Sequence, residues 1–174
     1  THEVYTRASA MKGIDMVGLA VHIGSQLMEL SPFQDACTRI RDLVAILRTD
    51  GFDVARLDLG GGLGVPYGAE PAPSPQEYAD TVLSALGALD CKIILEPGRA
   101  IVGNAGLLVV RVLYVKKGAL RTFIIVDGAM NDLMRPALYD ADHAIITVRE
   151  TLETDRLEGK DVVGPVCETG DTFG

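Results

Sequence analysis

Three short segments of the sequence carry residue types that can hold an anionic ligand. They are His22-Ile23-Gly24-Ser25-Gln26, Gly60-Gly61-Gly62 and Glu96-Pro97-Gly98-Arg99. Consecutive glycines let the backbone approach an anion closely and turn several N–H groups toward it, as in other phosphate-binding nests. An imidazole beside such a turn can stack on a planar ring. The Pro-Gly dipeptide would hold Glu96 and Arg99 apart in an extended loop, where each is free for a ligand.

Each segment taken alone also fits a role without a ligand. The glycines could form a tight turn between a strand and a helix, and His22 could be a hydrogen-bonded core histidine. Glu96 and Arg99 could form a surface salt bridge. Two nucleotide motifs do not fit, because the third glycine of a dinucleotide fingerprint would fall on Val65 and the Gly-Lys-Ser/Thr of a P-loop is missing.

Two later motifs, Asp127–His143 and Gly164–Asp171, add further candidates. Arg135 and Tyr139, separated by Pro136, could together grip a carboxylate, or could belong to an ordinary turn between strands. Cys167 follows a strand-like run, where a cysteine is usually buried and inert but can also be catalytic. Its neighbours, including Asp171, fit a solvated loop equally well.

The first hundred residues alternate predicted strands with predicted helices. Apolar, β-branched runs predict strands at Met16–Gly24, Arg56–Gly62 and Lys92–Gly98. Helices are predicted between them, with N-caps at Ser31 and Ser74, each followed by proline, and the first helix ends at Gly51. This alternation predicts parallel strands with helices packed outside, so the loops after the strands should converge on one mouth.

The pattern changes after Arg99. Strand-like runs with short polar connections and no convincing helix predict antiparallel strands. These runs are Gly106–Lys117, Arg121–Gly128, His143–Glu150 and Asp161–Glu168. We therefore expect an α/β domain at residues 1–104 and a β-rich domain at residues 105–174.

Both ends of the chain suggest an internal segment of a longer protein. Thr1–Met11 resembles the tail of a helix, and the chain stops within a motif. Three strand–helix units cannot close a barrel that needs eight. The expected fold is therefore the C-terminal part of a TIM-like (β/α)8 barrel followed by part of an antiparallel β domain.

Composition excludes several classes of partner. The 174 residues carry a net charge of −8, which disfavours binding to nucleic acid or to an anionic membrane. No apolar run approaches the length of a membrane span and no signal pattern opens the sequence, so we expect a soluble, cytoplasmic protein. The 3 cysteines lie far apart, which indicates free thiols rather than a disulfide framework or a zinc site.

Taken together and in order, the motifs resemble those of diaminopimelate decarboxylases, a family of fold-type III pyridoxal-phosphate enzymes. The motifs are "HIGSQ", "LGGGLG", "EPGRAIV", "MNDLMRPALYDADH" and "GPVCETGD". The resemblance implies a TIM-like barrel that holds pyridoxal 5′-phosphate and a β-rich domain. It also implies a homodimer with shared active sites that converts meso-diaminopimelate to L-lysine and carbon dioxide, the last step of lysine biosynthesis.

The resemblance also implies roles for residues at the cofactor. His22 matches the residue that lies against the cofactor ring, and Ser25 with Gly60–Gly62 matches the phosphate cradle. Glu96 matches the carboxylate that faces the pyridine nitrogen, where an anion keeps that nitrogen protonated. Gly98 belongs to the same cofactor-binding set. Arg99 matches a residue at the junction of phosphate and substrate.

For the substrate, Arg135 and Tyr139 match the clamp on its distal carboxylate. Cys167 matches the family's proton donor, contributed across the dimer interface, and Glu168 matches its substrate-binding neighbour. Thr169 stands where the family usually has serine. The family's Schiff-base lysine would lie upstream of these residues, and a cofactor-site tyrosine after the cysteine motif is also missing, so we expect the segment alone to be inactive.

Three other functions remain open from the sequence. An ornithine/arginine-type decarboxylase shares the histidine, glycine-rich and Glu-Pro-Gly-Arg elements, but the Arg135 clamp favours a substrate with a second carboxylate. A non-catalytic homologue could keep the scaffold to bind a partner. A simple phosphate-binding module would leave Cys167 and Arg135 without a role.

Overall fold

The computed structural model describes residues 1–68, 70–149 and 159–174. The chain divides into two compact units. The first unit comprises Thr1–Pro66 and Glu70–Gly106, and the second comprises Tyr67–Ala69 and Leu107–Gly174. Among the described residues, no helix is both long enough and apolar enough to cross a membrane.

The first unit is built on an open sheet of three parallel strands, as predicted. The strands are β1 (Gly18–Ala20), β2 (Arg56–Asp58) and β3 (Lys92–Ile94), in the order β1-β2-β3. Leu57 in the central strand pairs with Leu19 on one side and Ile93 on the other. Each strand is shorter than the predicted apolar run, and the residues that follow it form the loops at the strand exits.

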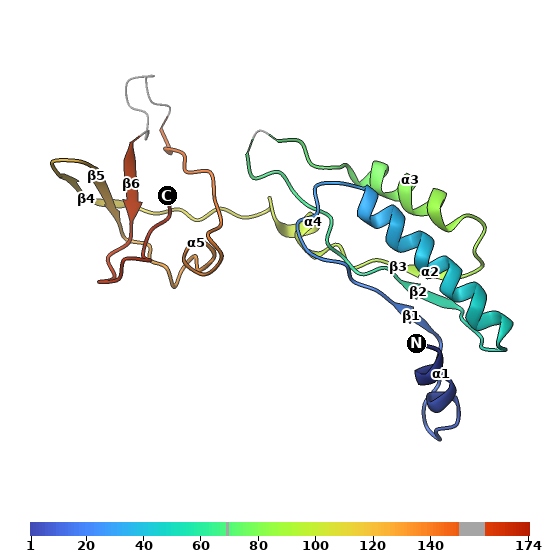
Figure 1. Ribbon diagram of the computed structural model, residues 1–174. Coiled ribbons are helices and arrows are strands. Elements are labelled where there is room, and N and C mark those ends of the chain that lie inside the picture. The colour runs from blue at the N-terminus through green and yellow to red at the C-terminus, as the bar shows by residue number, and fades with distance from the viewer. Residues whose placement is uncertain (69, 150–158) are drawn as a thin grey trace. The chain divides into compact units, whose positions relative to one another are not determined.

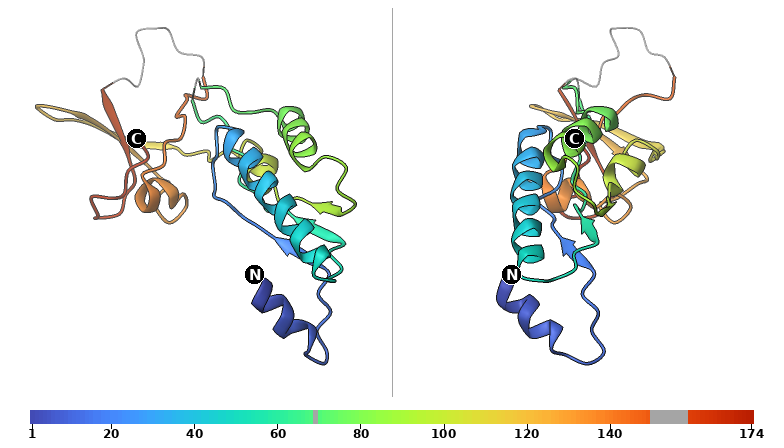
Figure 2. Two further views of the ribbon diagram at one scale, coloured as in Figure 1. Left: turned by 45° about the vertical axis from the view of Figure 1, so that its right-hand side comes forward. Right: turned by 90° about the vertical axis from the view of Figure 1, so that its right-hand side faces the viewer.

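Two helices, α2 (Ser31–Thr49) and α3 (Pro75–Leu86), lie side by side against this sheet (Figures 1 and 2). Their buried faces follow the helical period predicted from the sequence. The fully buried residues at the centre of the core are Val44, Leu47, Val54 and Leu57. The predicted N-terminal helix is also present as α1 (His2–Ser9), where the buried Tyr5 hydroxyl donates a hydrogen bond to the Gly18 carbonyl oxygen.

The two predicted helix caps had different outcomes. Ser74 caps α3 as expected, since the Glu77 amide donates to Ser74 Oγ at 3.2 Å and Glu77 Oε2 accepts from the Ser74 amide at 2.8 Å. The prediction for Ser31 was wrong: Leu30 already has a helical conformation and takes the N-cap position, so Ser31 is the first helical residue. Gly51, with φ of +88°, lies just after the C-cap of α2.

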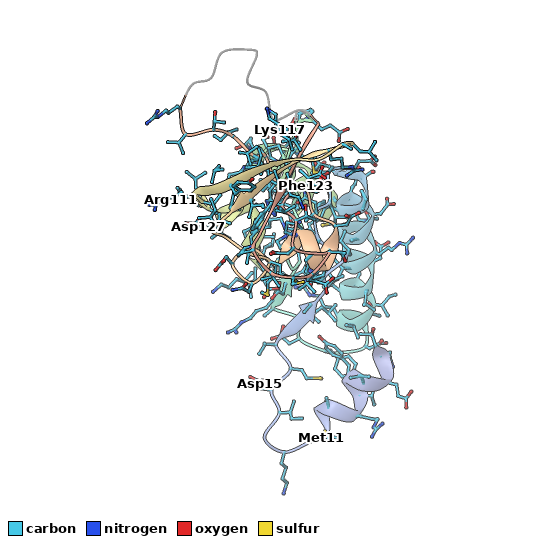
Figure 3. The ribbon with its side chains drawn as sticks, turned by 90° about the vertical axis from the view of Figure 1, so that its left-hand side faces the viewer. Met11, Asp15, Arg111, Lys117, Phe123 and Asp127 are labelled. Carbon is cyan, nitrogen blue, oxygen red and sulfur yellow. The ribbon has the colours of Figure 1, made fainter. Side chains whose placement is uncertain are left out.

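The second unit contains a three-stranded sheet in the order β4-β5-β6. Its strands are β4 (Val112–Lys117), β5 (Thr122–Val126) and β6 (Lys160–Val163). β4 and β5 form the predicted antiparallel pair, and Figure 3 labels Arg111 and Asp127 at one end of this ladder and Lys117 at the other. The small core of this unit contains Ile124, Val126, Val162 and Phe173.

The antiparallel prediction was wrong for β5 and β6, which pair in parallel. A short hairpin forces an antiparallel pair, but the connection from β5 to β6 is long enough to return to the same end of the sheet. It contains a short helix, α5 (Arg135–Tyr139), that the sequence did not predict. The predicted strand at His143–Glu150 does not form over residues 143–149, where Ile146 is 80% exposed, and Glu150 lies outside the described residues.

Candidate functional site

The loops after the three parallel strands lie together, and we call them the strand-exit cluster (residues 22–26, 60–62 and 96–99). The Glu96 amide donates to the Gly60 carbonyl oxygen at 2.8 Å, which ties the β3 exit to the β2 exit. The Leu27 amide donates to the Gly62 carbonyl oxygen at 2.9 Å, which ties the β1 exit to the same turn. The structure therefore brings the three candidate segments of the first unit into one place.

Close packing explains why residues 60–62 are all glycine. A Cβ on Gly60 would lie 2.6 Å from the Val21 carbonyl oxygen, and Gly60 also has φ of +67°. A Cβ on Gly61 would overlap the Glu96 carbonyl oxygen, and one on Gly62 would overlap that of Gly24. The central turn is thus enclosed by the two neighbouring exits, and only glycine permits this approach.

Two of the three glycine amides already have acceptors. The Gly60 amide donates to Asp58 Oδ1 at 2.8 Å, and the Gly61 amide donates to His22 Nδ1 at 3.2 Å. Because Nδ1 accepts this bond, the proton of the neutral His22 imidazole lies on Nε2. His22 is exposed, so the alternative of a core histidine does not hold. Its ring is instead oriented by the glycine turn.

Arg99 is held by Gln26, which lies in the first candidate segment but to which the sequence analysis gave no role. Gln26 Oε1 accepts from Arg99 Nη1 at 3.1 Å, and Gln26 Nε2 donates to the Val65 carbonyl oxygen at 2.6 Å. Gln26 has φ of +57°, which is uncommon for a residue with a side chain. The carboxamide side chain directly after Ser25 was the one sign in the sequence that Gln26 has a role. The sequence did not show that this side chain contacts Arg99, which lies 73 residues away. Ser25 itself is exposed.

The loop between Glu96 and Arg99 differs from the prediction. Gly98 begins a short helix, α4 (Gly98–Val102), so Arg99 lies on a helix rather than in an extended loop. The Glu96 side chain is exposed and Arg99 is half-buried. Within the described part of the chain no ion pair joins Glu96 to Arg99, so the alternative of a surface salt bridge is wrong and the Glu96 carboxylate faces solvent.

In the second unit, Arg135 and Tyr139 occupy the two ends of α5. The Arg135 guanidinium carbon lies 5.2 Å from the centroid of the Tyr139 ring, a cation–π contact that orients the guanidinium. Arg135 Nε is buried and has no hydrogen-bond partner among the described residues. A buried donor without an acceptor is unfavourable, and an anionic ligand would satisfy it.

Residues 164–171, which we call the thiol loop, carry Cys167 and Glu168. Both side chains are exposed and Cys167 is a free thiol, so the alternative of a buried, inert cysteine is wrong. Glu168 Oε1 accepts from Thr169 Oγ1 at 2.9 Å and from the Gly170 amide at 3.3 Å, and these bonds lower the pKa of the Glu168 carboxyl. A Cβ on Gly170 would lie 4.0 Å from Ala137 Cβ, which places α5 beside the thiol loop.

Comparison with known proteins identifies what this arrangement resembles. The profile of the family described as "Pyridoxal-dependent decarboxylase, pyridoxal binding domain" matches residues 1–103. The diaminopimelate decarboxylase of Haemophilus influenzae is 50% identical over 173 residues, which cover 99% of this chain and 41% of that protein. That of Aquifex aeolicus is 46% identical over 168 residues, or 96% of this chain and 40% of that protein.

Solved structures of diaminopimelate decarboxylases also resemble this chain. Diaminopimelate decarboxylase from Helicobacter pylori, complexed with L-lysine, superposes with a TM-score of 0.88 at 42% identity, covering 99% of this chain and 42% of that one. A lysine/ornithine decarboxylase from Vibrio vulnificus, complexed with cadaverine, gives a TM-score of 0.86 at 22% identity over 99% of this chain and 47% of that one, which shows a shared fold alone.

The chain spans about 41% of the length of the curated relatives it matches. The resemblance to diaminopimelate decarboxylases indicated by the motifs is confirmed at 41–50% identity along nearly the whole chain. The family profile matches residues 1–103 of 174, and its members depend on pyridoxal phosphate. This chain therefore belongs to the pyridoxal-dependent decarboxylases, and its residues 1–103 match their pyridoxal-binding domain.

Proposed function

We propose that the protein of which this chain is a part, with the remaining length found in the relatives, decarboxylates meso-diaminopimelate to L-lysine. We call that protein the complete protein. The observation that carries the proposal is the extent of the similarity to diaminopimelate decarboxylases, which covers 99% of the chain and so includes both the strand-exit cluster and the motifs with Arg135 and Cys167.

The strand-exit cluster fits pyridoxal phosphate. Its glycine turn is packed closely between the neighbouring strand exits, and it lies at the C-terminal ends of parallel strands, where α/β folds bind ligands. Residues 60–62, Ser25, Gly98 and Arg99 would hold the phosphate. When bound, the cofactor supplies an electron sink for the charge left on the substrate when carbon dioxide departs.

Three side chains would position and tune the ring. The exposed Glu96 carboxylate favours the protonated form of a pyridine nitrogen facing it. His22 offers a ring whose orientation is fixed by the Gly61 amide, so it can lie against a second planar ring. Arg99, held by Gln26, keeps a positive charge at the edge of the cluster.

The residues of the second unit would act on the substrate. Arg135 has the planar fork that binds a carboxylate with two hydrogen bonds, and its buried Nε lacks an acceptor among the described residues. Tyr139 completes this clamp on the distal carboxylate. The exposed Cys167 thiol would donate a proton to the substrate carbon, with Glu168 binding the substrate beside it.

The architecture of the complete protein is also part of the proposal. Residues 1–104 would be part of a TIM-like (β/α)8 barrel that binds the cofactor, and residues 105–174 part of a β-rich domain. The Schiff-base lysine would come from the remaining length found in the relatives. Lys92 is not a candidate, because it begins β3, at the opposite end of that strand from the exit at Glu96. A homodimer would share its active sites, with Cys167 acting on its partner's substrate. The expected cytoplasmic location stays a prediction.

An ornithine/arginine-type decarboxylase is the second candidate, supported by the fold shared with the Vibrio vulnificus lysine/ornithine decarboxylase. Such a substrate offers a distal amine or guanidine, which Arg135 would repel rather than bind. A non-catalytic homologue would have no use for the exposed thiol of Cys167 or for a buried Arg135 Nε that has no hydrogen-bond partner among the described residues.

The test is carbon dioxide release and lysine formation by the complete protein supplied with meso-diaminopimelate or with L-ornithine, with and without pyridoxal phosphate. We expect cofactor-dependent turnover, with kcat/KM about 10- to 100-fold higher for meso-diaminopimelate, the factor given by a charge-assisted contact of about 1.5–3 kcal/mol. A preference for ornithine would favour the second candidate. Cofactor binding without turnover of either substrate would favour the non-catalytic scaffold.

A further inference from the structure

Asp171 is buried to an extent that is unusual for a charged residue. It is 3% exposed, and within the described ranges it is the only charged residue that is buried. The sequence left a solvated loop open as an alternative here, and for Asp171 that alternative is wrong. A buried carboxylate is costly unless it is hydrogen-bonded, so its partners reveal what it stabilises.

The two carboxylate oxygens join two separate segments of the second unit. Asp171 Oδ1 accepts from the Met130 amide at 2.6 Å, and Oδ2 accepts from the Val166 amide at 2.7 Å. Met130 lies in the segment that leads into α5, and Val166 directly precedes Cys167. One side chain therefore connects the segment before Arg135 to the thiol loop.

The backbone of Asp171 closes the same loop. Its carbonyl oxygen accepts from the Gly164 amide at 2.9 Å, and its amide donates to the Glu168 carbonyl oxygen at 3.1 Å. Gly164 also makes room for the carboxylate, because a Cβ at that position would overlap both carboxylate oxygens. The sequence thus places a glycine where the buried acid needs space.

We infer that Asp171 is a positioning residue, which fixes the thiol loop with Cys167 and Glu168 relative to the segment that carries Arg135. The inference rests on the proposed function for its catalytic consequence. A carboxylate is needed because both donors are backbone amides that point at the two oxygens of one side chain. Asparagine keeps one acceptor oxygen but turns an NH2 group toward the other amide, so one contact becomes a clash of two donors.

The experiment compares Asp171→Asn with Asp161→Asn in the complete protein. Asp161 lies in the same unit but is partly exposed and pairs with Arg121 at 3.1 Å, so it controls for the loss of one negative charge. The first readout is the rate of Cys167 alkylation by iodoacetamide, assigned by peptide mass mapping, with the buried Cys37 as internal reference. The second is kcat and KM for meso-diaminopimelate at matched cofactor content.

We expect Asp171→Asn to change the Cys167 alkylation rate at least about fivefold and to lower kcat/KM at least about tenfold, as for the loss of about 1.4 kcal/mol or more. Asp161→Asn should leave both within twofold. Gly164→Ala, which displaces the carboxylate without removing it, should reproduce the effect and serves if Asp171→Asn does not fold.

The outcomes separate this inference from the proposed function. An alkylation rate unchanged within twofold in Asp171→Asn or Gly164→Ala would overturn the positioning role whatever the activity. A changed alkylation rate with unchanged kcat/KM would overturn its catalytic consequence and leave Asp171 as a purely structural residue. A changed alkylation rate in a protein whose unmutated form does not decarboxylate meso-diaminopimelate would support the positioning of the loop and refute the proposed function.

Discussion

Replacing Gly60 with alanine tests how closely the strand exits pack. The left-handed conformation of Gly60, with φ of +67°, costs a residue with a side chain about 1–2 kcal/mol. The added Cβ would lie 2.6 Å from the Val21 carbonyl oxygen and 2.9 Å from His22 Nδ1. In protein structures a Cβ atom essentially never lies closer than 3.0 Å to a non-bonded heavy atom. Overpacking of this kind typically costs about 1–3 kcal/mol. We therefore expect Gly60→Ala to lower the free energy of unfolding by about 2–5 kcal/mol.

Gly51→Ala is the matched control. Gly51 has φ of +88°, yet a Cβ there would meet nothing within 4 Å, so its replacement adds backbone strain without a clash. We expect a loss of about 1–2 kcal/mol for Gly51→Ala. The difference of about 1–3 kcal/mol between the two variants isolates the contribution of close packing at the exits.

The assay is urea unfolding of the complete protein without cofactor, followed by far-ultraviolet circular dichroism. A spectrophotometric titration with pyridoxal phosphate accompanies it, in which Gly60→Ala should bind the cofactor more weakly and Gly51→Ala should bind it normally. Equal losses of stability in the two variants would refute the reasoning that the neighbouring exits enclose Gly60.

Three further predictions concern the clamp, the thiol and a helix cap. Arg135→Ala should lower kcat/KM for meso-diaminopimelate by a factor that corresponds to a loss of about 2–4 kcal/mol of transition-state stabilisation, because the distal carboxylate loses its charged partner. A kcat/KM unchanged within twofold would rule out the clamp. Chains with Cys167→Ala mixed with chains lacking the Schiff-base lysine should regain activity, whereas heterodimers that form but stay inactive would show that Cys167 does not act on the partner subunit's substrate. Hydrogen bonds from Ser74 lower the pKa of Glu77, so stability from this cap is present above the unfolded-state pKa of about 4.3 and is lost as pH falls through the lower folded-state value. Glu77→Gln should make the free energy of unfolding depend less on pH between these two pKa values. An unchanged pH dependence would contradict a contribution of the Ser74–Glu77 cap to stability.

Local signals predicted the first unit well. The capping box of Ser74 and Glu77 and the helical periods of α2 and α3 are encoded within short stretches of sequence. The parallel sheet followed from the alternation of predicted strands and helices along the first hundred residues. The convergence of the strand exits followed from the geometry of parallel sheets. The close packing that requires glycine at residues 60–62 depends on neighbouring strands, so the sequence alone left a tight turn and a phosphate cradle as alternatives.

Predictions failed where contacts distant in sequence decide the structure. The parallel pairing of β5 and β6 depends on the path of the long connection between them, and no short stretch of sequence determines that path. The burial of Asp171 depends on the Met130 amide, 41 residues away, and the support of Arg99 depends on Gln26, 73 residues away. The short helix α5 contains a proline near its start, which fits a turn as well as a first helical turn.

The most direct test of the central claim is a crystal structure of the complete protein with pyridoxal phosphate bound. The central claim is that the strand-exit cluster holds the cofactor. We predict that the phosphate lies at the turn of residues 60–62, with Ser25 and Arg99 beside it, and that the Glu96 carboxylate lies within hydrogen-bond distance of the pyridine nitrogen. A cofactor whose phosphate contacts none of these residues, or whose pyridine nitrogen faces a group other than Glu96, would contradict the account.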